Sequence, residues 1–147
     1  MKNMKKLLCF LMVFAMVMQV KPVTAAMAET DPGGEAELQY TNISSLYAAI
    51  TRSGSTATCT ADYKVTVNRS SSMVMILQKS TDRSSYSNVT FWTQGYSGIG
   101  TKSLERTSTI TKGYYYRLKI VVQIYSASGS STVEKITEYS NVILYPQ

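Results

Sequence analysis

The stretch TKGYYYRLKIVVQIYSASG, residues 111–129, decides the fold of this chain. Within it, the side chains from residue 114 to residue 125 alternate between two faces. One face carries only apolar and aromatic side chains: Tyr114, Tyr116, Leu118, Ile120, Val122 and Ile124. The other face carries Tyr115, Arg117, Lys119, Val121, Gln123 and Tyr125. A period of two is typical of a strand that buries one face, whereas Arg117 and Lys119 exclude a membrane helix. The stretch therefore predicts a strand at the centre of a β-protein core.

The same period continues through most of the chain after residue 40. The segment TATCTADYKVTVN, residues 56–68, places Ala57, Cys59, Ala61, Tyr63, Val65 and Val67 on one face and mostly polar side chains on the other. Further strands are expected around residues 43–50 and in MVMILQK, VTFWTQ, SLERTSTI and TVEKITEYS, and the terminal NVILYPQ could pair as well. Turns rich in Ser and Gly separate these segments. Seven or eight short strands with such turns predict an all-β, two-sheet antiparallel sandwich.

The first 28 residues have the three-part layout of a secretory signal peptide. A basic start, MKNMKK, precedes an apolar run of twelve residues, LLCFLMVFAMVM, and the segment ends in small residues. A spanning helix needs about 20 apolar residues, so we expect cleavage, after Ala28 or after Ala25, rather than an uncleaved anchor. The chain is therefore expected to be a secreted, extracellular bacterial protein.

Residues 29–40 are predicted to form a flexible acidic arm, and residues 41–147 the sandwich domain. The arm contains Pro32-Gly33-Gly34, a typical turn and linker composition. The whole chain carries a net charge of +6, but after residue 28 there are eleven basic residues against nine acidic ones. This balance predicts no nucleic-acid partner, since such a partner requires clustered Lys and Arg. Nor do we expect a membrane partner after cleavage.

The segment ITKGYYYRLKIVVQIYSASG resembles strands E and F of fibronectin type III and immunoglobulin-like domains. The resemblance implies that Tyr116 is the corner tyrosine, whose hydroxyl bonds back to the chain. Leu118 would then stand where antibody domains carry a second cysteine, facing Cys59. Cys59 is the one cysteine left after residue 28, so we expect a buried free thiol. A nucleophilic cysteine or an interchain disulfide is the alternative.

Most of residues 40–140 also resembles an uncharacterised family of small secreted proteins from Gram-positive bacteria. The matching pieces are ISSLYAAITRSGSTATCTADYKV, MILQKS, FW and KGYYYRLKIVVQIY. This resemblance implies a β-sandwich and export, and it implies no activity.

Catalytic chemistry finds little support in the composition. The chain has no histidine, which excludes Ser-His-Asp and Cys-His catalysis and the commonest zinc ligand. Four of the nine carboxylates lie in the arm, and Glu134 and Glu138 are expected to be solvated surface charges. We therefore expect no enzyme activity, no catalytic residue, no metal and no cofactor.

A binding surface is the remaining functional candidate. Tyr115, Tyr125, Arg117 and Trp92 combine aromatic rings with a cation, which suits stacking on sugars or anchoring a protein. We expect a monomeric, non-catalytic extracellular module that binds an envelope glycan or an extracellular protein. The alternatives are rings that merely cover sheet surface, a small secreted carboxylate-dependent hydrolase, and a secreted antagonistic protein.

Overall fold

The computed structural model describes residues 40–147, which belong to one compact unit, Gln39–Gln147. The predicted signal peptide and all of the predicted arm except Tyr40 lie outside the described residues. The described chain forms eight strands: β1 (Ile43–Ser53), β2 (Thr56–Val65), β3 (Ser71–Ser80), β4 (Ser87–Tyr96), β5 (Gly100–Thr109), β6 (Tyr114–Tyr125), β7 (Thr132–Tyr139) and β8 (Ile143–Tyr145). It contains no helix of the length and apolar character needed to cross a membrane.

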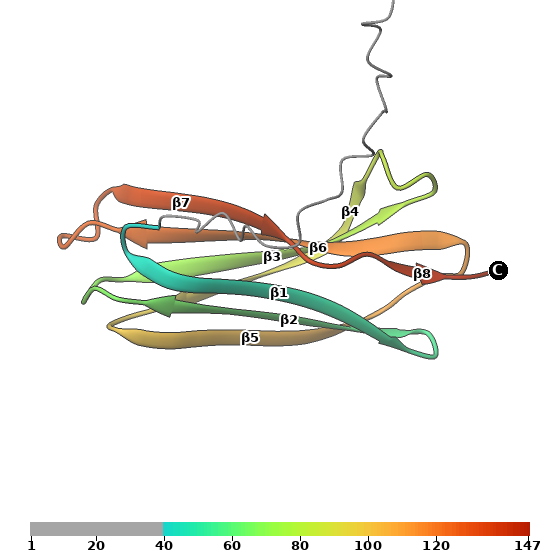
Figure 1. Ribbon diagram of the computed structural model, residues 1–147, viewed down its shortest axis with the longest axis horizontal. Helices are drawn as coiled ribbons and strands as arrows, with labels where there is room; N and C mark the ends of the chain where they lie inside the picture. Colours follow the sequence, from blue (N-terminus) through green and yellow to red (C-terminus); the bar gives the residue numbers. More distant parts are fainter. Residues whose placement is uncertain (1–39) are drawn as a thin grey trace, which may run out of the picture. The chain divides into compact units, whose positions relative to one another are not determined.

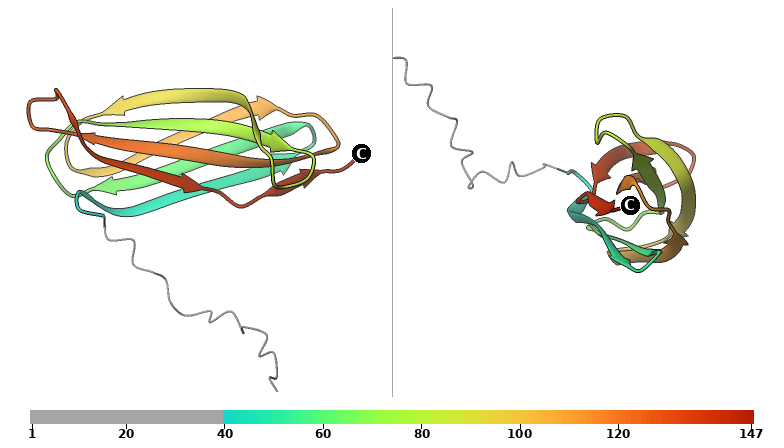
Figure 2. Two further views of the ribbon diagram at one scale, coloured as in Figure 1. Left: turned by 90° about the horizontal axis from the view of Figure 1, so that it is seen from above. Right: turned by 90° about the vertical axis from the view of Figure 1, so that its right-hand side faces the viewer.

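The strands form two antiparallel sheets that pack face to face (Figures 1 and 2). The smaller sheet has the order β1-β2-β5, and the larger sheet has the order β4-β3-β6-β7, with β8 also paired to β6. The predicted all-β sandwich of seven or eight strands is confirmed. Strand β6 is the central strand of the larger sheet, because it pairs with β3 on one side and with β7 and β8 on the other.

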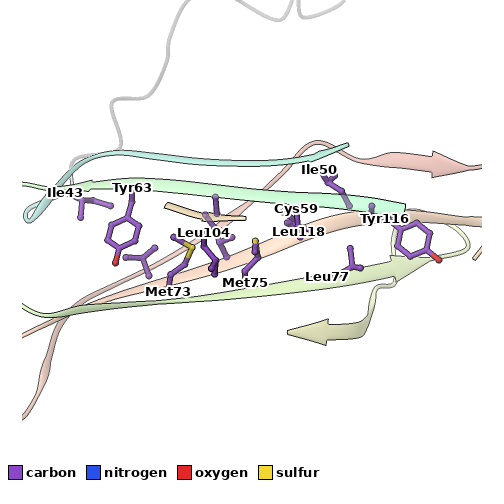
Figure 3. Close-up of a cluster of buried hydrophobic side chains, with 14 of the residues drawn as sticks. Ile43, Ile50, Cys59, Tyr63, Met73, Met75, Leu77, Leu104, Tyr116 and Leu118 are labelled. Carbon is purple, nitrogen blue, oxygen red and sulfur yellow. The ribbon is translucent and has the colours of Figure 1, made fainter. Parts of the chain in front are cut away.

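The alternation along β6 follows the pattern in its sequence. From Tyr116 to Ile124, every even-numbered side chain is buried between the sheets, and every odd-numbered one is half-buried on the outer face. The facing strand β2 behaves in the same way, with Ala57, Cys59, Ala61, Tyr63 and Val65 buried. These side chains form one core cluster with those of β3 and β6, and Figure 3 shows Cys59 and Tyr63 of β2 in it beside Met73 and Met75 of β3 and Leu118 of β6.

Cys59 lies in this core as a free thiol, together with Leu118. Both side chains are fully buried, and burial raises the pKa of the Cys59 thiol to about 12. A buried neutral thiol behaves as a small apolar side chain. Within the described residues, Cys59 therefore acts as one of the packed side chains of the core.

The Tyr116 hydroxyl fastens the chain where it enters β6. It accepts a hydrogen bond from the Thr111 N–H at 3.0 Å and donates one to the Thr111 carbonyl, also at 3.0 Å. Between them Gly113 turns the chain with a φ of 85°, which glycine adopts without strain. These bonds are the ones that the resemblance implies for a corner tyrosine.

Strands β1 and β7 lie at adjoining edges of the two sheets, and side chains bridge them. Glu134 on β7 accepts hydrogen bonds from the backbone N–H groups of Thr41 (3.0 Å) and Asn42 (2.9 Å). After β7, the Asn141 side chain accepts from the Ile50 N–H and donates to the Ile50 carbonyl. The expectation that Glu134 is merely a solvated surface charge is therefore wrong, because its carboxylate accepts hydrogen bonds from the backbone N–H groups just before β1.

Candidate functional site on the outer face of the larger sheet

The outer face of the larger sheet is built around the odd-numbered side chains of β6. Its register pairs Arg117 with Gln78 and Lys119 with Ile76 on β3. On the other side, Lys119 pairs with Tyr139 on β7. Residues paired in register point to the same face, so these side chains form one continuous surface.

The most ordered part of this surface is the Arg117 stack, which we define as Arg117, Tyr86 and Tyr139. The Arg117 Cζ atom lies 3.7 Å from the centre of the Tyr86 ring and 4.3 Å from that of Tyr139. The two rings come from opposite sides of β6, since Tyr86 directly precedes β4 and Tyr139 ends β7. Cations within about 6 Å of a ring centre are attracted by the ring quadrupole. The guanidinium is therefore held in place by both rings.

Hydrogen bonds to the neighbouring strand β3 also hold the same guanidinium. Arg117 Nε donates to Gln78 Oε1 at 3.0 Å, and Gln78 Nε2 donates to Asn88 Oδ1 at 2.9 Å. Gln78 is only 8% exposed, so the side chain at the centre of these bonds is shielded from water. A guanidinium has five N–H donors, and Arg117 uses only its Nε–H group in these bonds. The stack is thus preorganised and can still donate to a ligand.

The loop between β3 and β4 places Tyr86 and a second cation over the surface. The Asp82 carboxylate accepts hydrogen bonds from the N–H groups of Ser84 and Ser85, both at 2.9 Å, and from the Ser80 hydroxyl. These bonds hold the pKa of Asp82 well below its usual range, with the backbone bonds contributing most. The loop also brings Arg83 Cζ to 5.4 Å from the centre of the Tyr115 ring. Arg83 adopts a φ of 64° here, which is uncommon outside glycine.

The structure brings together only part of the set proposed from the sequence. Tyr115 and Arg117 are neighbours on the outer face. Tyr125 shares that face but lies eight residues beyond Arg117 along β6, roughly 26 Å away at about 3.3 Å per residue. Its hydroxyl is hydrogen-bonded to the Ser72 hydroxyl at 2.9 Å. Tyr125 is therefore outside the Arg117 stack.

Trp92 does not lie on the outer face. It pairs with Met75, whose side chain is fully buried between the sheets, and it packs half-buried against the core. Its neighbour Phe91 pairs with Ile76 and is 69% exposed. Of these two adjacent rings, Phe91 is thus the one that contributes to the surface.

Tyr139 was not predicted from the sequence. Tyr86 was a candidate only as one of the aromatic residues of SYSNVTFWTQGYSG, with Trp92 and Tyr96, and not as a neighbour of Arg117. The alternation in TVEKITEYS could have assigned Tyr139 to a strand face, but only the pairing with β6 shows which residues it meets. For Tyr86 no comparable signal exists, because it belongs to a loop whose path depends on Asp82 and its hydrogen bonds.

Other chemistry gains no support from the described residues. Within residues 40–147, no group of three or more His, Cys, Asp or Glu side chains could hold a metal ion. Glu134 and Glu138 share a face of β7, yet their Cα atoms are about 13 Å apart along the strand. The Glu134 carboxylate is engaged by the backbone N–H groups of Thr41 and Asn42, which gives it a structural role in the described residues.

Comparison with known proteins gives no independent indication of function: no protein-family model matches the chain, and the search of curated proteins returned no match.

Proposed function

We propose that the chain is a secreted, non-catalytic binding module that holds an envelope glycan or an extracellular protein on the outer face of the larger sheet. The observation that carries this proposal is the Arg117 stack. Two rings and a hydrogen bond to the buried Gln78 side chain hold one guanidinium in position on the outer face of the sheet. Binding surfaces concentrate their energy in aromatic and arginine side chains that are already ordered.

The same proposal includes secretion of the chain and its relationship to immunoglobulin-like or fibronectin type III-like domains. The basic start, short apolar run and small residues before Ala28 support a cleaved signal peptide. The two-sheet order and the Tyr116 corner bonds support an immunoglobulin-like or fibronectin type III-like relationship. N-terminal sequencing of protein recovered from the culture medium would test export. The expected first residue is Glu29, or Ala26 if cleavage follows Ala25.

The binding surface is tested by retention of the purified protein on bacterial envelope material and on immobilised extracellular glycans and proteins. We expect Tyr139→Ala and Arg117→Met to weaken retention of whichever ligand is bound by about tenfold or more, as for residues at the centre of an interface. Tyr47→Ala is the matched control, because Tyr47 is 58% exposed on the smaller sheet. Thermal unfolding of each variant verifies its fold. The proposal is wrong if folded Tyr139→Ala and Arg117→Met retain every ligand as the wild type does.

A further inference from the structure

Charge is distributed unevenly over the described residues. Eleven of the fifteen basic residues of the chain and five of the nine acidic ones lie in residues 40–147, which gives this part a net charge of +6. None of the five carboxylates occupies an outward-facing strand position of the larger sheet. Asp62 and Glu105 are on the smaller sheet, Glu134 and Glu138 face inward on β7, and Asp82 is bound within its loop.

The cations of the outer face follow the line of β6. Arg83 lies beside Tyr115, then come Arg117 and Lys119, and Lys135 is paired with Gln123 further along the strand. From the level of Tyr115 to that of Gln123 is roughly 26 Å at about 3.3 Å per residue. A row of this length fits an extended chain with repeated negative charges better than a single small anion.

Aromatic rings accompany this row. Tyr139 is 43% exposed next to Arg117 and Lys119, Tyr86 and Tyr115 are half-buried, and Phe91 is exposed two strands away. Rings of this kind offer flat apolar faces, and a tyrosine adds a polar edge. The apolar C–H faces of sugar rings can stack on them, while acidic groups on the same sugars meet the cations.

We infer that the ligand of this surface is a linear polyanionic glycan, a sugar chain that carries carboxylate, sulfate or phosphate groups and lies along β6. This inference rests on the proposed function and narrows its ligand class. The row of cations favours a chain with repeated negative charges, and the accompanying rings favour a chain of sugars. Binding of an acidic protein instead is an outcome of the test below.

Three probes separate these contributions when their binding to the purified full-length protein is measured by calorimetry: dextran sulfate, uncharged dextran and poly-L-glutamate. We expect binding to dextran sulfate, no measurable binding to dextran and at least tenfold weaker binding to poly-L-glutamate. Three or four ionic contacts, at a slope of about 0.7 to 0.9 per contact, reduce the affinity roughly 20- to 150-fold between 50 and 200 mM salt.

Substitutions test whether dextran sulfate binds to the outer face of the larger sheet. Lys119→Gln combined with Lys135→Gln should weaken binding to dextran sulfate and make the affinity less dependent on salt. Tyr139→Ala should weaken the binding and leave its salt dependence unchanged. Lys64→Gln is the matched control, since Lys64 is exposed on β2 of the smaller sheet. Equal loss in Lys64→Gln and in the paired variant would overturn the inference, because any surface lysine would then suffice.

The outcomes also distinguish this inference from the proposed function. If Tyr139→Ala and Arg117→Met lose a neutral glycan or a protein while dextran sulfate is never bound, the surface is a binding site and the polyanion inference is wrong. If poly-L-glutamate binds as tightly as dextran sulfate, the sugar part of the inference is wrong. If the same two variants change the binding of no ligand, the proposed function itself fails.

Discussion

Replacing Tyr116 with phenylalanine removes one oxygen atom from the corner between β5 and β6. That oxygen accepts from the Thr111 N–H and donates to the Thr111 carbonyl, at 3.0 Å in each case. The ring itself is buried and packs in the core cluster, so phenylalanine keeps the packing. The substitution therefore isolates the contribution of the corner bonds.

The expected loss of unfolding free energy is about 1 to 3 kcal/mol. Each intramolecular hydrogen bond contributes about 0.5 to 1.5 kcal/mol net, and both bonds to the Thr111 backbone are lost. The bond between the Tyr116 and Thr111 hydroxyls, at 3.2 Å, is also lost, but the exposed Thr111 hydroxyl can bond water in its place. Thr111 is exposed, so water can reach its freed N–H and carbonyl, which favours the lower half of this range. For a domain of this size, the melting temperature falls by about 4 °C per kcal/mol.

Urea unfolding followed by tryptophan fluorescence measures this loss. Trp92 is the only tryptophan of the chain and packs half-buried against the core, so its emission reports on sandwich unfolding. Tyr47→Phe is the control, because that hydroxyl sits on a ring that is 58% exposed, and its loss should cost less than 0.5 kcal/mol. If Tyr116→Phe is as stable as Tyr47→Phe, the corner bonds do not stabilise the fold and our reasoning about the corner is refuted.

Two further predictions concern the core and the strand edges. Burial raises the Cys59 pKa from 9.0 to about 12, so the thiol ionises at lower pH in the unfolded chain than in the folded one. The contribution of the neutral thiol to the free energy of unfolding is therefore complete below pH 9. It is lost as the pH rises toward 12, by about 1.4 kcal/mol per pH unit. Cys59→Ala should flatten this alkaline loss in urea unfolding between pH 8 and pH 11, and equal slopes would contradict the assignment. Glu134→Ala removes the acceptor for the Thr41 and Asn42 N–H groups and should speed hydrogen exchange before and at the start of β1, at a cost of about 1 to 3 kcal/mol. Glu105→Ala, on an exposed strand position, is its control, and unchanged exchange in Glu134→Ala would show that the carboxylate does not hold this segment.

Local alternation was enough to predict the core. In an extended chain, successive side chains point to opposite faces, so the sequence from Tyr114 to Tyr125 assigns each side chain to a face without knowledge of its neighbours. The same alternation predicted that Cys59 and the other apolar residues of β2 are buried. Because apolar burial on one face is the dominant stabilising term, the fold class followed from these patterns.

The composition of the proposed binding surface depends on the register between strands. Arg117 meets Tyr139 only because β7 pairs with β6 in the observed register, which a bulge shifts between Ile124 and Tyr125. A second shift, between Leu77 and Gln78, sets Asn88 opposite Gln78 at the beginning of β4. A shift of one residue in pairing would move a whole strand's side chains to the other face, and no local pattern fixes it.

The alternation in the chain thus determined that this is a sandwich and which side chains of β2 and β6 fill it, whereas the role of Tyr116 was implied by the resemblance. Long-range pairing decided that Phe91 rather than Trp92 faces outward, that Tyr86 and Tyr139 enclose Arg117, and that Glu134 serves the backbone before β1. The physical reason is that the face of a side chain depends on its own strand, whereas its partners depend on strands far away in the sequence.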